Sequence, residues 1–282
     1  MPSAALLGQS VLSGIFVGAL YGLLGLGLSL AWGLLGQINL AHFALAVLGA
    51  YLTYQLALAG LDPFLTLAVI LPAFFVLGVA LHWLFARFAV SLFNSLLVTF
   101  GLTVIIEAAI QFVWSADFVR LESHYSQVRY RLGAFYIPFP ELLTLIFAVV
   151  LALGLWALLR YTDFGKALRA AAEDPAMAQA FGINARALAL VLSGLAAALA
   201  GIAGLCIALS YTLAPSQIYA WIGVVFAVVM LGGLGSALGP LVAGIVIGVS
   251  EAITMALTAP SWAPLVSFSL LIALLILRPE RI

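Results

Sequence analysis

The chain has 282 residues, of which 66% are hydrophobic and only 7% are charged, and its formal net charge is zero. A soluble domain carries about 25% charged residues, so the composition excludes an ordinary soluble fold, and the balanced charge gives no reason to expect a nucleic-acid partner. Lipid accommodates this much apolar surface. The composition therefore predicts an integral membrane protein that crosses the bilayer several times as helices.

Nine stretches are apolar and long enough, or nearly so, to span a bilayer, which takes about 20 helical residues. In chain order they are residues 10–32, 38–59, 64–85, 92–114, 139–159, 188–211, 218–234, 239–257 and 262–277. The first is too long for a cleaved secretory signal and no Lys or Arg precedes it, so we predict a retained helix. The seventh is short, and Gly-rich segments can be broken or re-entrant. We predict an all-α membrane bundle of about eight to ten spans in one domain, residues 1–282.

Two polar stretches, residues 115–138 and 160–187, separate some of these spans. Because Lys and Arg collect on the cytoplasmic side of membrane proteins, we place residues 160–187 in the cytoplasm. Seven of the ten basic residues then lie inside, namely Arg87, Arg160, Lys166, Arg169, Arg186, Arg278 and Arg281. The other three, Arg120, Arg129 and Arg131, lie in an external loop at residues 115–138. The pattern predicts a cytoplasmic carboxyl terminus and an external amino terminus.

Glycine recurs at three- and four-residue spacing within the first and sixth spans. Small residues at this spacing let helix backbones approach closely, either inside one subunit or against a second membrane subunit. Residues 33–49 and 232–248 also match at six positions without gaps. Transporters often contain internal repeats, but a chain this rich in Gly, Ala, Leu and Val produces such matches by chance at least as readily.

The cytoplasmic loop is predicted to be helical, because it carries signals for the start and end of helices. Asp174 followed by Pro175 is a helix start, with Asp as the N-cap and Pro in the first helical position. Gly182 is a helix stop, and Asn184 can cap the next span. A helix of two turns is not stable alone. It packs on its own spans, or it docks into a partner with Met177 and Phe181 as apolar anchors.

The sequence AAAED at 170–174, with GI at 182–183, resembles the coupling segment of ABC importer permeases, which rests in a cleft of the ATPase subunit. Other stretches resemble, more narrowly, the LivH-type branched-chain amino acid permeases. They are YGLLGLGLSL (21–30), WG (32–33), NLAH (39–42), LGAY (48–51), AGIAG (200–204), VMLGGLGS (229–236), GP (239–240), GIVIG (244–248) and LRP (277–279). The chain departs from this pattern at Phe43, where the family is expected to have Gly, and this bears on the shape of a nearby cavity.

The resemblance implies the permease subunit of an importer that works by alternating access on branched-chain amino acids or another small polar solute, such as an amide. It implies a second, LivM-like permease, two cytoplasmic ATPase subunits that bind the ATP, an external solute-binding protein, and a bacterial inner membrane. No cofactor is expected on this chain. The expected ATPase contacts are Glu173, Asp174, Pro175, Met177, Ala178, Phe181 and Gly182. Arg120, Arg129 and Arg131 are expected either to be solvated or to meet the binding protein.

Two acids, Glu107 and Glu251, fall inside predicted spans. Ionisable groups in the bilayer are costly and face a cavity or a partner, so each acid lines the solute pathway or makes a structural hydrogen bond between helices. Gln37, Asn39 and His42 cluster near the start of the second span. They either satisfy a break in the helix or line the pathway.

An ATPase or a hydrolase on this chain is not expected. The single Lys, Lys166, is not in a phosphate-binding loop, and no Gly-x-Ser-x-Gly motif occurs. His82, His124 and Cys206 have no partners at metal-ligand spacing, so no metal site is expected. The alternative function is a self-contained secondary transporter, with Glu107 and Glu251 as proton- or sodium-coupling acids. A passive channel ranks third, and a membrane-embedded enzyme ranks last.

Overall fold

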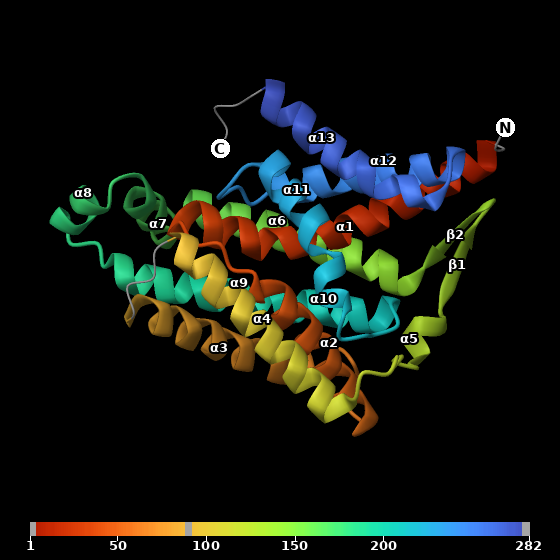
Figure 1. Ribbon diagram of the computed structural model, residues 1–282, viewed down its shortest axis with the longest axis horizontal. Coiled ribbons are helices and arrows are strands. Elements are labelled where there is room, and N and C mark those ends of the chain that lie inside the picture. Colours follow the sequence, from red (N-terminus) through yellow and green to blue (C-terminus); the bar gives the residue numbers. More distant parts are fainter. Residues whose placement is uncertain (1–3, 88–91, 278–282) are drawn as a thin grey trace.

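The computed structural model describes residues 4–87 and 92–277 and shows a bundle of helices (Figure 1). Within these residues, seven helices are long and apolar enough to cross a membrane. They are α1 (Ala4–Leu35), α2 (Ala41–Leu58), α3 (Leu67–Arg87), α4 (Leu92–Trp114), α6 (Phe139–Tyr161), α9 (Ala185–Ser210) and α12 (Gly239–Leu257). The other two predicted spans form the shorter apolar helices α11 (Ile222–Gly232) and α13 (Ala263–Leu277). The prediction of a polytopic helical bundle is confirmed, while Arg278, Pro279 and Arg281 lie outside the described residues.

Helix α1 is the centre of the bundle and packs against α12, α9, α6 and α11. Its most extensive contact is with α12, which runs beside it (Figure 1). Glycines allow this close approach: a Cβ atom on Gly14 would lie 2.6 Å from the Cα of Val249, and one on Gly22 would lie 2.8 Å from the Cα of Leu241. The glycine spacing of the first span therefore serves packing inside this subunit.

Helices α2 and α9 form the second closely packed pair, and α3 covers the other side of α9. A Cβ atom on Gly204 of α9 would lie 2.6 Å from the carbonyl oxygen of Ala46 on α2. The buried apolar side chains come mainly from α1, α2 and α9. By contrast, α3, α4 and α6 bury about a fifth of their residues, from 17% to 22%. These three helices present their outer faces to the surroundings of the chain.

Two non-helical breaks interrupt the bundle, and the second of them lies against the last turns of α1. One follows α1 at residues 36–40, and the other separates α11 from α12 at residues 233–238. The hydroxyl group of Ser29 lies 3.2 Å from the carbonyl oxygens of Gly233 and Ser236, and the N–H of Gly235 donates to the carbonyl of Ser29 at 3.0 Å. The matching segments 33–49 and 232–248 thus share one local order, which is the end of a helix, a break and a new helix.

The two polar stretches lie at opposite ends of the molecule (Figure 1). One end carries α5 (His124–Gln127) and an antiparallel hairpin of β1 (Arg129–Leu132) and β2 (Phe135–Pro138), which the sequence analysis did not predict. The other end carries α7 (Asp163–Glu173) and α8 (Pro175–Ala180), so the prediction of short helices is confirmed there. The short helices α10 (Gln217–Ala220) and η1 (Pro260–Trp262) precede α11 and α13.

Candidate functional site

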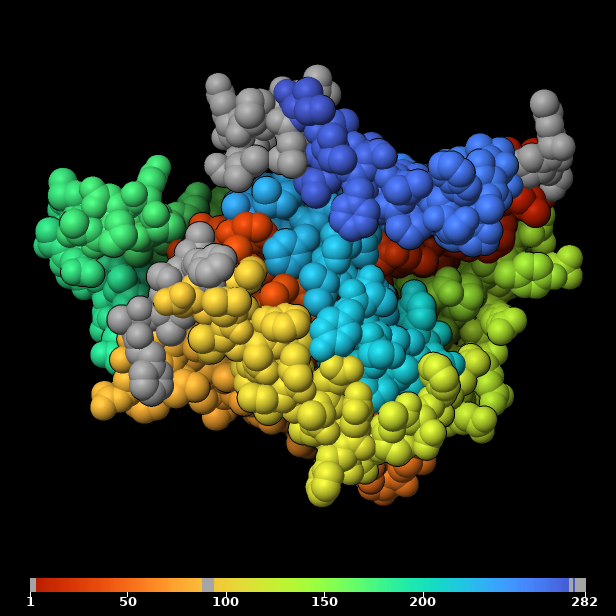
Figure 2. All heavy atoms as spheres, viewed as in Figure 1, coloured from red at the N-terminus to blue at the C-terminus, as the bar shows by residue number. Residues whose placement is uncertain are grey.

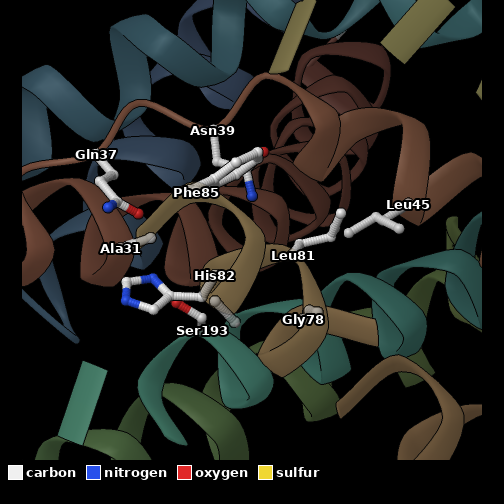
Figure 3. Close-up of a pocket in the computed structure, with 11 residues that line it drawn as sticks. Ala31, Gln37, Asn39, Leu45, Gly78, Leu81, His82, Phe85 and Ser193 are labelled. Carbon is white, nitrogen blue, oxygen red and sulfur yellow. The ribbon is translucent and has the colours of Figure 1, made fainter. Parts of the chain in front are cut away.

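Gln37 and Asn39 lie in the break after α1. They line a small pocket together with His82 of α3 and Ser193 of α9 (Figure 3). The cavity of about 20 Å³ has room for one water molecule. Within the described residues, Asn39 Oδ1 and His82 Nδ1 are buried without a hydrogen-bond partner. Buried polar atoms are normally paired, so this pocket is suited to a water molecule or another small polar group.

His42 lies apart from that pocket. Its Nε2 atom is 3.1 Å from the carbonyl oxygen of Leu24, and the ring is buried where α2 crosses α1. Gly27 leaves the space for it, since a Cβ atom there would lie 2.5 Å from Cε1 of the imidazole ring. Phe43 is also buried and stacks on Phe226 of α11, with ring centroids 6.3 Å apart. Both side chains occupy the helix core, so the structure separates His42 from Gln37 and Asn39.

Glu107 lies on the partly exposed surface of α4. Its Oε2 atom accepts a hydrogen bond from the hydroxyl group of Tyr219 on α10 at 2.5 Å. Its Oε1 atom is 3.4 Å from Nε2 of Gln111, one turn further along α4. Both oxygens of this carboxylate therefore have a hydrogen-bond partner, and the side chain remains partly exposed.

Glu251 is buried between three helices. Its carboxylate accepts a hydrogen bond from Tyr21 of α1 at 3.1 Å and another from Ser267 of α13. Of the two roles expected for Glu251, these contacts fit the structural hydrogen bond between helices, because they connect α12 to α1 and to α13. Glu107 and Glu251 have separate partners on separate helices.

The helix signals of the polar stretch at 160–187 are confirmed. Asp174 Oδ1 accepts hydrogen bonds from the N–H groups of Ala176 and Met177, each at 3.0 Å. Gly182 has φ of +83°, a left-handed conformation that favours glycine. Asn184 Oδ1 accepts from the N–H of Ala187 at 3.0 Å and caps α9. The short helix α8 is thus defined at both ends by the residues that the sequence indicated.

The surface of α8 presents two apolar side chains to solvent. Met177 is 58% exposed and Phe181 is 82% exposed, whereas Ala178 is only 4% exposed. Ala178 therefore lies beneath the helix, and Met177 and Phe181 are the apolar groups that a partner can reach. Glu173, Asp174, Pro175 and Gly182 are exposed around them.

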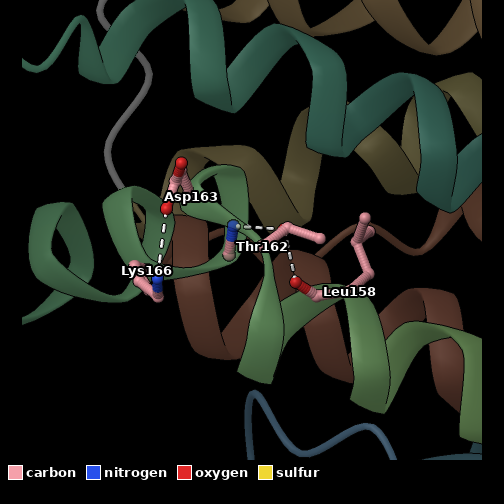
Figure 4. A network of polar contacts seen from close by, with 5 residues as sticks. Leu158, Thr162, Asp163 and Lys166 are labelled. Atoms are coloured by element: carbon pink, nitrogen blue, oxygen red, sulfur yellow. Dashed lines mark hydrogen bonds and ion pairs between the residues drawn. The ribbon is translucent and has the colours of Figure 1, made fainter.

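Helix α7 is joined closely to the end of α6 (Figure 4). The hydroxyl group of Thr162 donates to the carbonyl of Leu158 at 2.6 Å and accepts from the N–H of Gly165 at 3.1 Å. Lys166 pairs with Asp163 at 3.1 Å, although both side chains are well exposed and the pair contributes little. The junction between α6 and α7 is therefore a hydrogen-bonded corner.

At the opposite end, the three arginines of the predicted external loop lie in two places. Arg120 lines a pocket beside the connection between α2 and α3. Arg129 and Arg131 lie on the exposed strand β1, and Arg131 Nε donates to the carbonyl of Gly133 at 3.2 Å. These positions do not form one cationic patch.

The connection between α2 and α3 is joined to α5 by Tyr125, whose ring packs edge-on against Phe64 with ring centroids 4.9 Å apart. The hydroxyl group of Tyr125 donates to Asp62 Oδ2 at 2.8 Å, and this bond raises the pKa of Tyr125. The contact holds α5 against the bundle. It therefore also fixes one side of the pocket that Arg120 lines.

Several polar residues of these sites were missed by reasoning from the sequence, among them Tyr21, His82, Ser193 and Tyr219. His82 was interpreted as an ordinary side chain because it has no metal-ligand spacing. The available signal was a polar group inside an otherwise apolar span, which applies to His82 and Ser193. The partners of the two acids carry no such signal, because tyrosine is common at membrane interfaces and hydrogen bonding between distant helices depends on the fold.

Comparison with known proteins places this arrangement among transport proteins. Residues 10–275 match the family described as branched-chain amino acid transport system / permease component. The chain is 27% identical, over 97% of its length and 94% of theirs, to the high-affinity branched-chain amino acid transport system permease proteins BraD of Pseudomonas aeruginosa and LivH of Escherichia coli K12. It is 32% identical to the probable branched-chain amino acid transport permease protein LivH of Methanocaldococcus jannaschii, over 79% of this chain and 73% of that one. No solved structure matches the chain.

The family match covers every long apolar helix described above, from α1 to α12, and most of α13. It identifies the molecule as a multi-pass membrane transport subunit and not an enzyme. The chain belongs to the branched-chain amino acid transport system permease family.

Proposed function

We propose that the chain is the permease subunit of an ATP-driven ABC importer that moves branched-chain amino acids, or a related amino acid or amide, inward by alternating access. The observation that carries the proposal is the capped helix α8 with Met177 and Phe181 exposed on it, in a chain whose family match extends over residues 10–275. Two exposed apolar side chains on a short helix form a surface suited to a groove on another protein.

The energy for transport comes from two cytoplasmic ATPase subunits that bind the ATP. Each permease subunit places α8 in a cleft of one ATPase, with Met177 and Phe181 as apolar anchors. Glu173, Asp174, Pro175 and Gly182 form the exposed border of the contact, and Ala178 supports the helix from below. The hydrogen-bonded corner at Thr162 then passes the motion of the ATPase to α6. This chain needs no cofactor of its own.

The remaining partners complete a bacterial inner-membrane importer. A homologous, LivM-like permease or a second copy of this chain packs on the outer faces of the exposed helices. A solute-binding protein docks at the external end, where Arg120, Arg129 and Arg131 are located. The end with α7 and α8 is cytoplasmic, as is the carboxyl terminus. This orientation is supported by the distribution of Lys and Arg along the sequence.

The solute pathway runs along the surface that includes Gln37, Asn39 and Glu107. His42 and Glu251 are buried and hydrogen-bonded to neighbouring helices, so they stabilise the bundle and do not contact the solute. A self-contained secondary transporter has no comparable support, because Glu107 and Glu251 have separate partners and the relatives are named as permease components of transport systems.

The test is co-purification of the tagged chain from its native membrane in mild detergent. We compare the wild type with Phe181→Arg and with Phe118→Arg, a control that alters an exposed Phe at the other end of the molecule. ATPase subunits with a phosphate-binding loop, identified by mass spectrometry, are expected with the wild type and with Phe118→Arg. They are expected to be lost with Phe181→Arg. Equal recovery with both variants would refute the proposed coupling surface.

A further inference from the structure

A polar cluster lies on the face of the bundle that α4 and α10 share. Figure 2 shows these helices, in yellow and cyan, next to each other on the side facing the viewer. The cluster consists of Glu107 and Gln111 of α4 and Tyr219 of α10. Glu107 is partly exposed, and Gln111 and Tyr219 are exposed, so the cluster is open to the surroundings of the described residues. The surrounding surface of α4 is apolar.

The position of Glu107 along α4 places the cluster within the apolar layer. Trp114, the last residue of α4, is two turns further on, or about 10 Å along the helix axis. Trp114 donates to Gln55 of α2 at 2.9 Å, so this end of α4 is fixed to the bundle. A carboxylate at such depth is costly in contact with lipid and instead faces a water-filled cavity or a partner. The face with Glu107 is therefore not a lipid-facing surface.

The cation that complements Glu107 does not come from a second copy of this chain. Within the described residues, the eight Lys and Arg residues lie in the connection after α4, in β1, in α7 or at the ends of helices. Arg87, Arg160 and Arg186 come nearest to spanning segments, and each lies in the first or last turn of its helix. In a symmetric pair, none of them reaches the depth of Glu107. With no cation available from a second copy of this chain, a cationic group of the solute is the complement that we assign to Glu107.

The neighbouring surface of α4 suits the rest of such a solute. Phe100, Val104, Glu107 and Gln111 are spaced by three or four residues and share one face of the helix. Phe100 is 46% exposed and Val104 is 43% exposed. An ammonium group bound to Glu107 thus places an aliphatic side chain over these two apolar residues.

We propose that Glu107 is the specificity-determining residue that binds the ammonium group of the transported solute. Tyr219 and Gln111 are positioning residues, because they donate to Oε2 and Oε1 and hold the carboxylate on the partly exposed face of α4. The inference rests on the proposed function, since it requires a solute pathway along this face. It adds the recognition chemistry, which is a carboxylate for a cationic nitrogen beside an apolar wall.

The experiment uses proteoliposomes with the complete transporter: the permease pair, the ATPase subunits and the external binding protein. Uptake of labelled leucine is measured for the wild type and for Glu107→Gln, Tyr219→Phe and Asp117→Asn, the last being an exposed acid outside the cluster. Loss of a charged hydrogen bond is expected to lower the uptake rate of Glu107→Gln about ten- to a hundredfold. Tyr219→Phe is expected to lose a few-fold, and Asp117→Asn is expected to match the wild type. Binding of the ATPase subunits stays unchanged in all of them.

A second readout tests the location independently of the rate. In the assembled transporter, Glu107→Cys is expected to react with a water-soluble trimethylammonium thiol reagent, and leucine is expected to slow that reaction. The native Cys206 is buried and gives little background. Wild-type uptake by Glu107→Gln, or a Glu107→Cys thiol that does not react, overturns the inference while leaving the proposed function in place. Failure of the wild type itself to take up any amino acid overturns both.

Discussion

Replacing Gly14 by alanine would place a methyl group inside the contact between α1 and α12. The new Cβ would lie 2.6 Å from the Cα of Val249, 2.7 Å from the carbonyl oxygen of Gly248 and 2.9 Å from the Cβ of Ala252. Two of these atoms are backbone, so the helices must move apart. Overpacking of this kind costs about 1–3 kcal/mol. The gain of about 0.5–1 kcal/mol for alanine over glycine in a helix offsets only part of it.

The matched control is Gly154→Ala in α6, where nothing lies within 4 Å of the added Cβ. Only the helix gain of about 0.5–1 kcal/mol applies there. Melting in detergent, followed by the fluorescence of the six Trp residues, is expected to show a lower Tm for Gly14→Ala and an equal or higher Tm for Gly154→Ala. If both variants melt alike, the close packing of α1 on α12 is not what stabilises the bundle.

Three further substitutions test local contacts. Asp174→Ala removes the N-cap of α8 and is expected to cost about 1 kcal/mol, seen as faster hydrogen exchange in α8 alone. Ser29→Ala removes the buried hydroxyl group that contacts the break after α11, and the free energy of unfolding is expected to fall by about 1 kcal/mol, seen as a lower Tm; an unchanged Tm would contradict it. The pKa of Tyr125 is raised above 10.0 by its bond to Asp62, so that bond stabilises the fold below this pH and is lost as the pH rises through the raised pKa. The wild type should therefore have a higher Tm than Tyr125→Phe at pH 8, and this difference in Tm should shrink in strong alkali.

The parts of the structure that follow from local sequence were predictable. The apolar spans depend only on length and composition, and their boundaries agree with the helices to within a few residues. The limits of α8 were also predictable, because a capping Asp174 and a left-handed Gly182 act on their immediate neighbours.

The features that depend on how helices pack were not predictable. The sequence analysis predicted Ala178 among the ATPase contacts. In the structure α8 packs against α9, and Ala178 lies buried on that side of the helix. Likewise, Glu251 meets Tyr21, which is 230 residues away in the sequence. The hairpin of β1 and β2 was missed because its strands are only four residues each, too short for a clear alternation of polar and apolar side chains.

The central claim is that this chain is a permease driven by separate ATPase subunits. The most direct test is leucine uptake into proteoliposomes that contain either the complete set of subunits or this chain alone. We expect uptake that requires enclosed ATP, the ATPase subunits and the external binding protein, with none in vesicles that contain only this chain. Uptake by the chain alone under a proton or sodium gradient would contradict the account and would identify a secondary transporter.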